Sequence, residues 1–163
     1  MNRQTRPITP KNLVSDLIFQ DECYAILGAC FEVYKNQGCG LHEPVYHKCP
    51  EIELGSQRIP FLSKLPQTLR YRGRRLVQTF TPDFICYGKI IVEIKAVSAL
   101  VDEHRAQLLN YLNATGCELG LLVNFGHYPG MDYERLFNKK QDQTMFISEN
   151  LVSFRVFSGR KPL

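Results

Sequence analysis

The sequence has no apolar run long enough to cross a lipid bilayer, and residues 1–11 are polar, without the apolar core of a secretory signal peptide. We therefore expect no membrane partner and a cytoplasmic location. Internal repeats and low-complexity segments are absent as well. The six cysteines show no Cys-x-x-Cys spacing, so they lack the grouping that an iron–sulfur cluster requires, and we expect most of them to be core thiols.

The 163 residues suit one domain. A hydrophobic content of 44% with 22% charged residues predicts a soluble globular protein. We expect a flexible arm at 1–15, a folded domain at 16–140, and a C-terminal extension at 141–163 in which 151–157 could form an edge strand. A homo-oligomer is compatible with this composition.

The net charge of +4 indicates a polyanionic partner only weakly, so the distribution of charge matters more. Four arginines lie in one short segment that also contains Tyr71, namely Arg70, Arg72, Arg74 and Arg75. This cluster could bind the phosphates of a nucleic acid, or it could be the solvated tip of a hairpin.

Apolar periodicity and turn residues predict an α/β domain. One helix is expected at 21–37, ended by Gly38, and a second begins near Glu43 and should end or kink early at Pro50. Strands are expected at 69–71, 76–80, 84–86 and 90–97, followed by a helix at 102–115 and a central strand at 119–125. The order is two helices, three or four strands, a helix and a strand.

The strand at 90–97 is apolar except for Glu93 and Lys95. Side chains two apart in a strand share a face, so a carboxylate and an ammonium project together from a strand that otherwise looks buried. Such a pair on an edge strand would be a solvated face, whereas burial of unpaired charge costs several kcal/mol. Asp83 favours the functional interpretation, since a hairpin with its turn at 87–88 would place Asp83 beside Glu93. Two carboxylates and a lysine are suited to a divalent cation and an activated water.

These motifs resemble those of the PD-(D/E)XK nuclease superfamily, whose signature corresponds here to Pro82-Asp83 followed by Glu93-Ile94-Lys95. The pattern Gly40-x-x-Glu43-x-x-Tyr46 is similar to the motif of the GxxExxY protein family. Two further segments resemble later motifs of that family: 104–112, which contains the Gln-x-x-x-Tyr element of RecB-type exonucleases, and 120–125. The resemblance extends from about Asp21 to Phe137. It implies a restriction-endonuclease-like αβββαβ core, with a mixed central sheet flanked by helices.

The resemblance also implies a site. Asp83 and Glu93 would bind Mg²⁺ or Mn²⁺ together with the backbone carbonyl of Ile94, and Glu43 would add a carboxylate from the N-terminal helical region. Glu43 could instead be a helix-start residue favoured by the helix dipole. Lys95 would orient or deprotonate the attacking water, or stabilise charge on the phosphate; both roles remain open.

Gln107 and Tyr111 are four residues apart on the helix predicted at 102–115, and His104 precedes Gln107 by three, so the three side chains share one helix face. The resemblance places this face beside the active site; without it, a solvated polar face would be favoured. His42 and His47 flank the Glu43 motif without a known zinc spacing, so we expect them to border the site rather than to bind a metal.

The sequence therefore predicts a metal-dependent nuclease that hydrolyses DNA phosphodiester bonds, with an exonuclease that prefers single-stranded DNA ends as the leading hypothesis. A structure-specific or nicking endonuclease is the enzymatic alternative. A nucleic-acid-binding subunit without activity is a third class. All four residues whose loss would mark such a subunit are present, namely Glu43, Asp83, Glu93 and Lys95.

Overall fold

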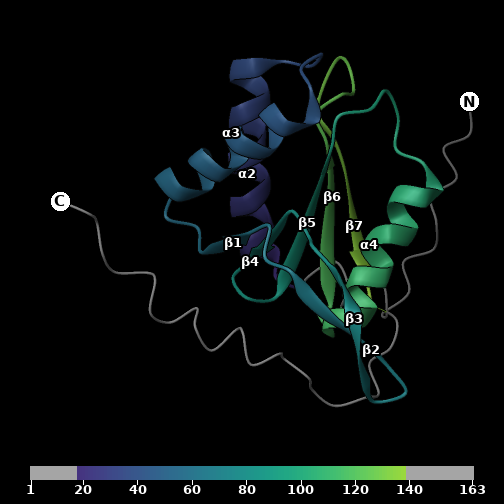
Figure 1. The fold of residues 1–163 in the computed structure, drawn as a ribbon. Helices are drawn as coiled ribbons and strands as arrows, with labels where there is room; N and C mark the ends of the chain where they lie inside the picture. The colour runs from purple at the N-terminus through teal and green to yellow at the C-terminus, as the bar shows by residue number, and fades with distance from the viewer. Residues whose placement is uncertain (1–17, 139–163) are drawn as a thin grey trace, which may run out of the picture.

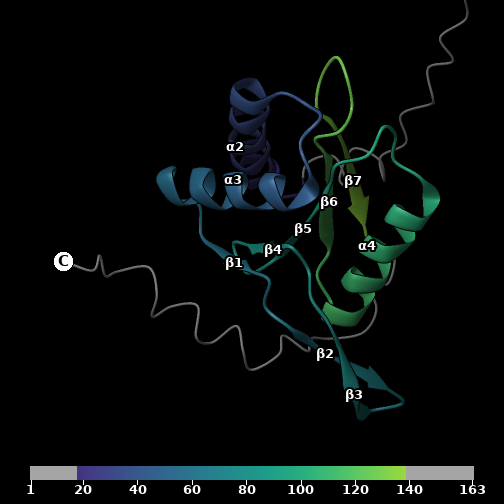
Figure 2. The same cartoon turned by 45° about the horizontal axis from the view of Figure 1, so that its top comes forward.

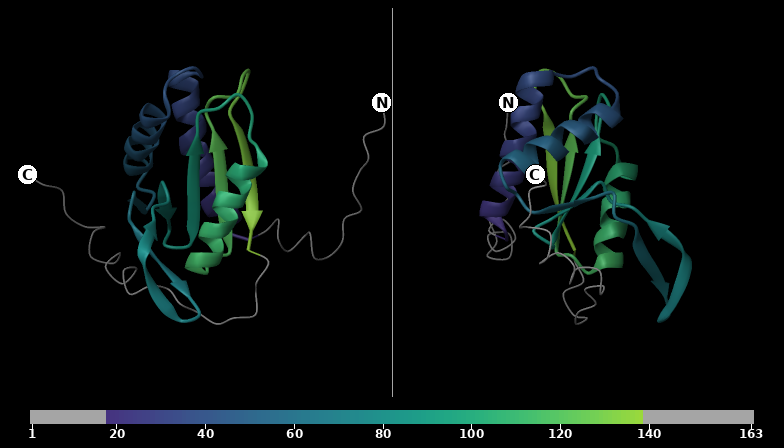
Figure 3. Two further views of the ribbon diagram at one scale, coloured as in Figure 1. Left: turned by 45° about the vertical axis from the view of Figure 1, so that its right-hand side comes forward. Right: turned by 60° about the vertical axis from the view of Figure 1, so that its left-hand side comes forward.

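The computed structural model describes residues 18–138. The arm expected at 1–15, the extension at 141–163 and the strand expected at 151–157 lie outside the described residues. In the described part, a twisted central sheet is sandwiched between two helical layers (Figure 1). Helices α2 and α3 cover one face of this sheet, and α4 covers the other (Figure 3, left).

The central sheet has five strands in the order β1-β4-β5-β6-β7. The pair β5–β6 is parallel, and the other three neighbouring pairs are antiparallel, so the sheet is mixed. The parallel pair requires a crossover, which α4 supplies. The strands are β1 Phe61–Ser63, β4 Phe84–Cys86, β5 Ile90–Lys95, β6 Leu119–Asn124 and β7 Asp132–Phe137.

Strand β5 decides which side chains face each helical layer. Ile90, Val92 and Ile94 pack into the core beneath α2 (Gln20–Gln37) and α3 (Glu43–Ser56). Ile91 faces the opposite way and packs with Leu108 and Leu112 of α4 (Asp102–Thr115). Because side chains alternate along a strand, Glu93 shares the α4 face with Ile91. The alternation thus aims the only acidic side chain of β5 away from the larger apolar core.

The close fit of α4 on the sheet depends on a glycine in β6. A Cβ atom at Gly120 would lie 2.7 Å from the Leu108 side chain, which is closer than atoms can approach without a shift. The helix can therefore lie directly on β6 only because this position has no side chain.

The αβββαβ core predicted from sequence is confirmed, but its strands are distributed differently. The hairpin of β2 (Gln67–Tyr71) and β3 (Arg74–Phe80) forms a separate two-stranded sheet, which projects from the body as an arm (Figures 2 and 3). The first core strand is β1, which was not predicted; it has three residues, and none of them is fully buried. Strand β7 was also missed, since its intermediate burial gives no apolar run. The 119–125 strand is central, as predicted, between β5 and β7.

Pro50 was expected to end or kink the second helix early, and the early end is wrong. Helix α3 continues through Pro50 to Ser56. Proline inside a helix costs about 3 kcal/mol because it removes a hydrogen bond and crowds the preceding turn. Here Tyr46, Pro50 and Leu54 are the buried residues of the helix, and they recur every four residues. Burial of the proline ring against the core offsets part of the cost of a proline inside the helix. Tertiary packing therefore keeps α3 helical where the local sequence predicts its end.

The six cysteines are all free thiols and differ in their burial. Cys23, Cys30 and Cys86 are buried free thiols, and burial raises the pKa of Cys30 to about 12, as expected for core residues. The other three cysteines are half-buried free thiols.

Among residues 18–138, no helix is long and apolar enough to cross a membrane.

Candidate active site

Asp83 and Glu93 lie next to each other, as the hairpin spacing predicted. Strands β4 and β5 pair with Phe84 opposite Val92, so the same register continued by one residue brings Asp83 opposite Glu93. The backbone N–H of Asp83 donates to Glu93 Oε1 at 3.1 Å, and Ile94 N–H donates to Asp83 Oδ2 at 2.8 Å. Both carboxyl groups are almost fully buried, with 6% and 3% of the residue exposed. Their positions are therefore fixed by the backbone of the neighbouring strand.

The two carboxyl groups are electrostatically coupled. Burial raises the pKa of Glu93, and the adjacent Asp83 charge raises it further, to about 8. The hydrogen bond from Asp83 N–H and the charges of Lys95 and Lys64 act in the opposite direction but do not prevail. A second negative charge at this place is thus strongly disfavoured unless a cation accompanies it.

Lys95 begins a polar chain that leads to the projecting hairpin. Its Nζ donates to Gln107 Oε1 at 3.1 Å, and Gln107 Nε2 donates to the Tyr111 hydroxyl at 2.9 Å. The Tyr111 ring stacks on Phe80, with centroids 4.7 Å apart. The structure therefore brings Gln107 to Lys95 and Tyr111 to Gln107. It also adds Phe80, at the end of β3, which ties the base of the hairpin to this face of α4.

A cavity of about 240 Å³ opens on the side of Asp83 that faces α3. Its lining consists of Glu43, Pro44, His47, Lys64, Asp83 and Ile94. Three predicted metal ligands thus reach one cavity, whereas Glu93 lies behind Asp83 and does not line it. The exposed Glu43 at the start of α3 is brought here because α3 packs across β5.

Two residues that line the cavity, Lys64 and His47, contact Asp83 directly. Lys64 was not predicted as a site residue, and His47 was expected only to border the site. Lys64, which directly follows β1, contacts Asp83 Oδ1 through its Nζ. The His47 ring stacks on Phe84 at 4.7 Å, and its Nε2 lies 3.9 Å from the same Asp83 oxygen. That nitrogen is buried and has no hydrogen-bond partner among residues 18–138. The four-residue spacing of His47 from Glu43 could have indicated that both lie on one face of α3; no comparable signal marked Lys64.

The Gly40-x-x-Glu43-x-x-Tyr46 motif positions the loop that precedes Glu43. The Tyr46 hydroxyl donates to the Gly38 carbonyl at 2.7 Å and accepts from Leu41 N–H at 3.2 Å. Its buried ring stacks on Phe125 of the sheet core, with centroids 4.9 Å apart. Gly40 adopts φ +99°, a conformation that other residues rarely take. The tyrosine and the glycine therefore build the turn that delivers Glu43 to the cavity.

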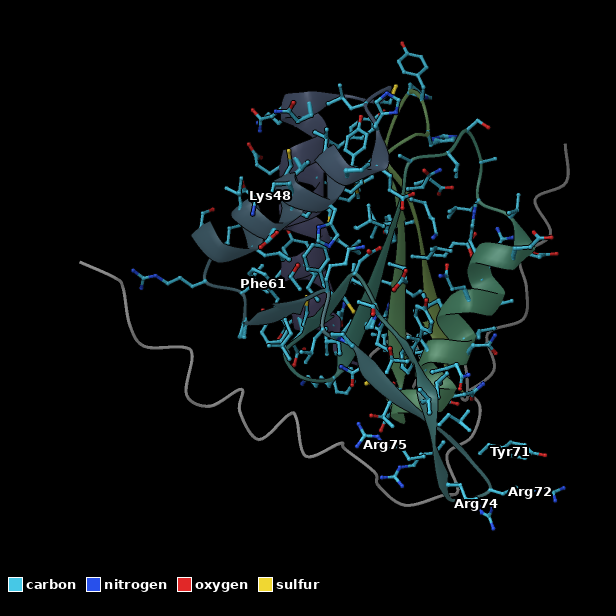
Figure 4. The ribbon with its side chains drawn as sticks, viewed as in Figure 1. Lys48, Phe61, Tyr71, Arg72, Arg74 and Arg75 are labelled. Atoms are coloured by element: carbon cyan, nitrogen blue, oxygen red, sulfur yellow. The ribbon has the colours of Figure 1, made fainter. Side chains whose placement is uncertain are left out.

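The remaining predicted contacts are spread over α4 and the hairpin. His104 Nδ1 accepts from Val101 N–H at 3.2 Å, so this side chain is engaged at the start of α4. The four arginines are exposed on the hairpin, and Figure 4 shows three of them, Arg72, Arg74 and Arg75. Within residues 18–138 none of the four forms an ion pair; Arg70 lies opposite Arg75, and the Arg72 guanidinium lies 5.5 Å from the centre of the Tyr71 ring.

The donor set fits a small, hard divalent cation. Asp83 and Glu93 are two adjacent carboxyl groups whose mutual repulsion a cation would relieve. His47 Nε2, 3.9 Å from Asp83 Oδ1, is a buried nitrogen without a hydrogen-bond partner among residues 18–138. In the described part of the chain, no three His, Cys, Asp or Glu side chains converge as a complete cage. Mg²⁺ needs no such cage, because it keeps several waters and is commonly held by one or two carboxylates.

Comparison with known proteins identifies the family. The sequence profile of the PD-(D/E)XK nuclease superfamily matches residues 20–136, and the chain belongs to this superfamily, whose nucleases use divalent metal ions, typically Mg²⁺ or Mn²⁺. No curated protein matches the chain significantly. A solved structure described as "Crystal structure of SSO0001" is similar in fold, with a TM-score of 0.49 and 16% sequence identity over 79% of this chain. The present chain spans 62% of the length of that protein.

Proposed function

We propose that this protein is a metal-dependent deoxyribonuclease of the GxxExxY type and that residues 16–140 form its catalytic domain. The observation that carries the proposal is the pair of buried carboxyl groups, Asp83 and Glu93, fixed by backbone hydrogen bonds beside Lys95. Burial of two adjacent carboxyl groups is costly for folding, whereas a divalent-cation site requires carboxylates placed in this way.

In this proposal Asp83 and Glu93 hold Mg²⁺ or Mn²⁺, with Glu43 and the Ile94 carbonyl as further ligands. A bound divalent cation would supply polarisation of the scissile phosphate and screening of its charge. Lys95 is held by Gln107 at 3.1 Å, so its ammonium is kept on the α4 side of the site, where it would orient the attacking water or stabilise charge on the phosphate. Gln107, itself bonded to Tyr111, acts as a positioning residue for Lys95.

We further propose that the substrate is single-stranded DNA, degraded from an end. The cavity of about 240 Å³ is small, and a duplex about 20 Å wide would have to be opened or bent at a cost of several kcal/mol. The hairpin arginines would hold the phosphates of the strand, and the exposed Tyr71 ring offers a surface on which a base can stack. His104 would add a weaker contact, because its Nδ1 already serves the helix start.

The test compares linear and closed circular single-stranded DNA, with Mg²⁺, Mn²⁺ or EDTA, and includes linear duplex DNA. We expect stepwise shortening of the linear single strand with either metal, slower attack on the duplex, and no reaction in EDTA. Equal cleavage of the circle would refute the exonuclease proposal and favour the endonuclease alternative. Binding without cleavage of any substrate would favour the inactive subunit.

A further inference from the structure

Lys64 holds an unusual place in the candidate site. It follows β1 in a left-handed backbone conformation with φ 49°, uncommon for a residue with a side chain. Its N–H donates to the Asp83 carbonyl at 3.0 Å, and its Nζ contacts the Asp83 carboxylate. Both ends of Lys64 are therefore bound to the residue that we propose as the principal metal ligand.

The two oxygens of Asp83 have different surroundings. Oδ2 accepts from the backbone N–H of Ile94 inside the sheet, whereas Oδ1 receives the ammonium of Lys64 and has His47 Nε2 at 3.9 Å. Lys64 and His47 both line the cavity, so Oδ1 is the oxygen that a cation entering the cavity would meet. An ammonium and a divalent cation cannot share that oxygen without strong mutual repulsion.

The Lys64 side chain is not enclosed by the core. Its side chain is 54% exposed, and a lysine has a flexible stem that can carry its charge to another partner. Lys95 offers no substitute at Oδ1, since its own ammonium is directed to Gln107. Lys64 is thus a half-exposed cation that lines the cavity and is bound to the proposed metal ligand.

We propose that Lys64 is a displaceable internal cation: it neutralises Asp83 in the metal-free protein, and it transfers to a phosphate of the nucleic-acid strand when a divalent metal takes Asp83 Oδ1. The proposal rests on the proposed function of the site. If Lys64 moves in this way, the binding of the divalent metal and the binding of the nucleic-acid strand are coupled. A bound strand draws Lys64 from Asp83 and tightens metal binding, and bound metal tightens strand binding by the same factor. The protein then holds its metal firmly only when substrate is present.

The first experiment measures Mn²⁺ binding by calorimetry without nucleic acid. Lys64→Gln removes the charge and shortens the side chain by one atom, and we expect it to bind Mn²⁺ about tenfold more tightly than the wild type, because one charge-assisted hydrogen bond no longer competes. Lys64→Arg should restore the weaker affinity. The matched control is Lys89→Gln, which removes another lysine–carboxylate pair, with Glu22 at 2.6 Å, far along β4–β5 from the site; its Mn²⁺ affinity should equal that of the wild type.

The second experiment repeats the titration with a phosphorothioate single strand that resists hydrolysis. Wild-type protein should gain about tenfold in Mn²⁺ affinity from the strand, and Lys64→Gln should gain much less. Equal Mn²⁺ affinity in wild type and Lys64→Gln, or equal gains from the strand, overturns the role of Lys64 while leaving the metal site standing. If none of the proteins binds Mn²⁺, the proposed metal site and the Lys64 inference both fail.

Discussion

Replacement of Glu93 by glutamine should stabilise the metal-free protein at neutral and alkaline pH while removing its ability to bind metal. Glu93 is 3% exposed, and its Oε1 accepts from Asp83 N–H. A glutamine side chain has nearly the same shape and keeps an oxygen for this bond. It cannot ionise, so it never brings a second negative charge next to Asp83.

The magnitude follows from the raised pKa of Glu93. Burial and the Asp83 charge raise it from the ordinary value of 4.5 to about 8. Between these values the folded protein keeps a proton that the unfolded chain releases, so the free energy of unfolding falls as pH rises, by about 1.4 kcal/mol per pH unit. The penalty reaches about 3 kcal/mol at pH 7 and on the order of 5 kcal/mol above pH 8. Glu93→Gln escapes it entirely.

The assay is urea unfolding followed by circular dichroism, in EDTA, at pH 5, 7 and 8.5 for both proteins. Groups distant from the site titrate equally in both proteins, so their contribution cancels in the difference between variant and wild type. We expect this difference to be small at pH 5 and to grow with pH in favour of the variant. Saturating Mn²⁺ should then stabilise only the wild type, by about 2.7 kcal/mol at a hundredfold excess over Kd. A difference that stays constant with pH would refute the reasoning.

Four further outcomes are expected. Asp83→Asn should eliminate cleavage with an unchanged circular dichroism spectrum, and retained wild-type rates would show that the assigned site is wrong. Lys95→Ala should lose about 100-fold in rate yet keep calorimetric Mn²⁺ binding, because an ammonium is not a metal ligand; loss of Mn²⁺ binding by the folded variant would contradict this role. Replacing both Arg70 and Arg75 by alanine should weaken single-strand binding and reduce its salt slope by about 1.4, and an unchanged slope would mean that they contact no phosphate. Glu134→Gln removes a carboxylate whose pKa is lowered by the hydrogen bonds that Arg105 of α4 donates to it. It should cost about 1 kcal/mol at pH 7, and this cost should decline as acid protonates Glu134 in the wild type; a cost that does not decline with falling pH would exclude the ion pair as the cause.

The sequence by itself determined the elements whose patterns are local. Helical periodicity ended by glycine identified α2 and α4, and an apolar run after a turn identified β5, with its two charged residues on one face. The neighbourhood of Asp83 and Glu93 also followed from sequence, because a hairpin between two short strands fixes the register of its residues. Gln107 and Tyr111 shared a face by the geometry of the helix alone.

Only the tertiary structure decided which other side chains complete the site. Lys64 reaches Asp83 because β1 pairs with β4, and His47 reaches it because α3 packs across β5; neither contact leaves a pattern in the local sequence. Burial that raises the pKa of Glu93 likewise arises from elements distant in the chain. The continuation of α3 through Pro50 also depends on tertiary packing. The proline ring is buried in the core, and the local sequence, which predicts an early end, carries no information about this burial.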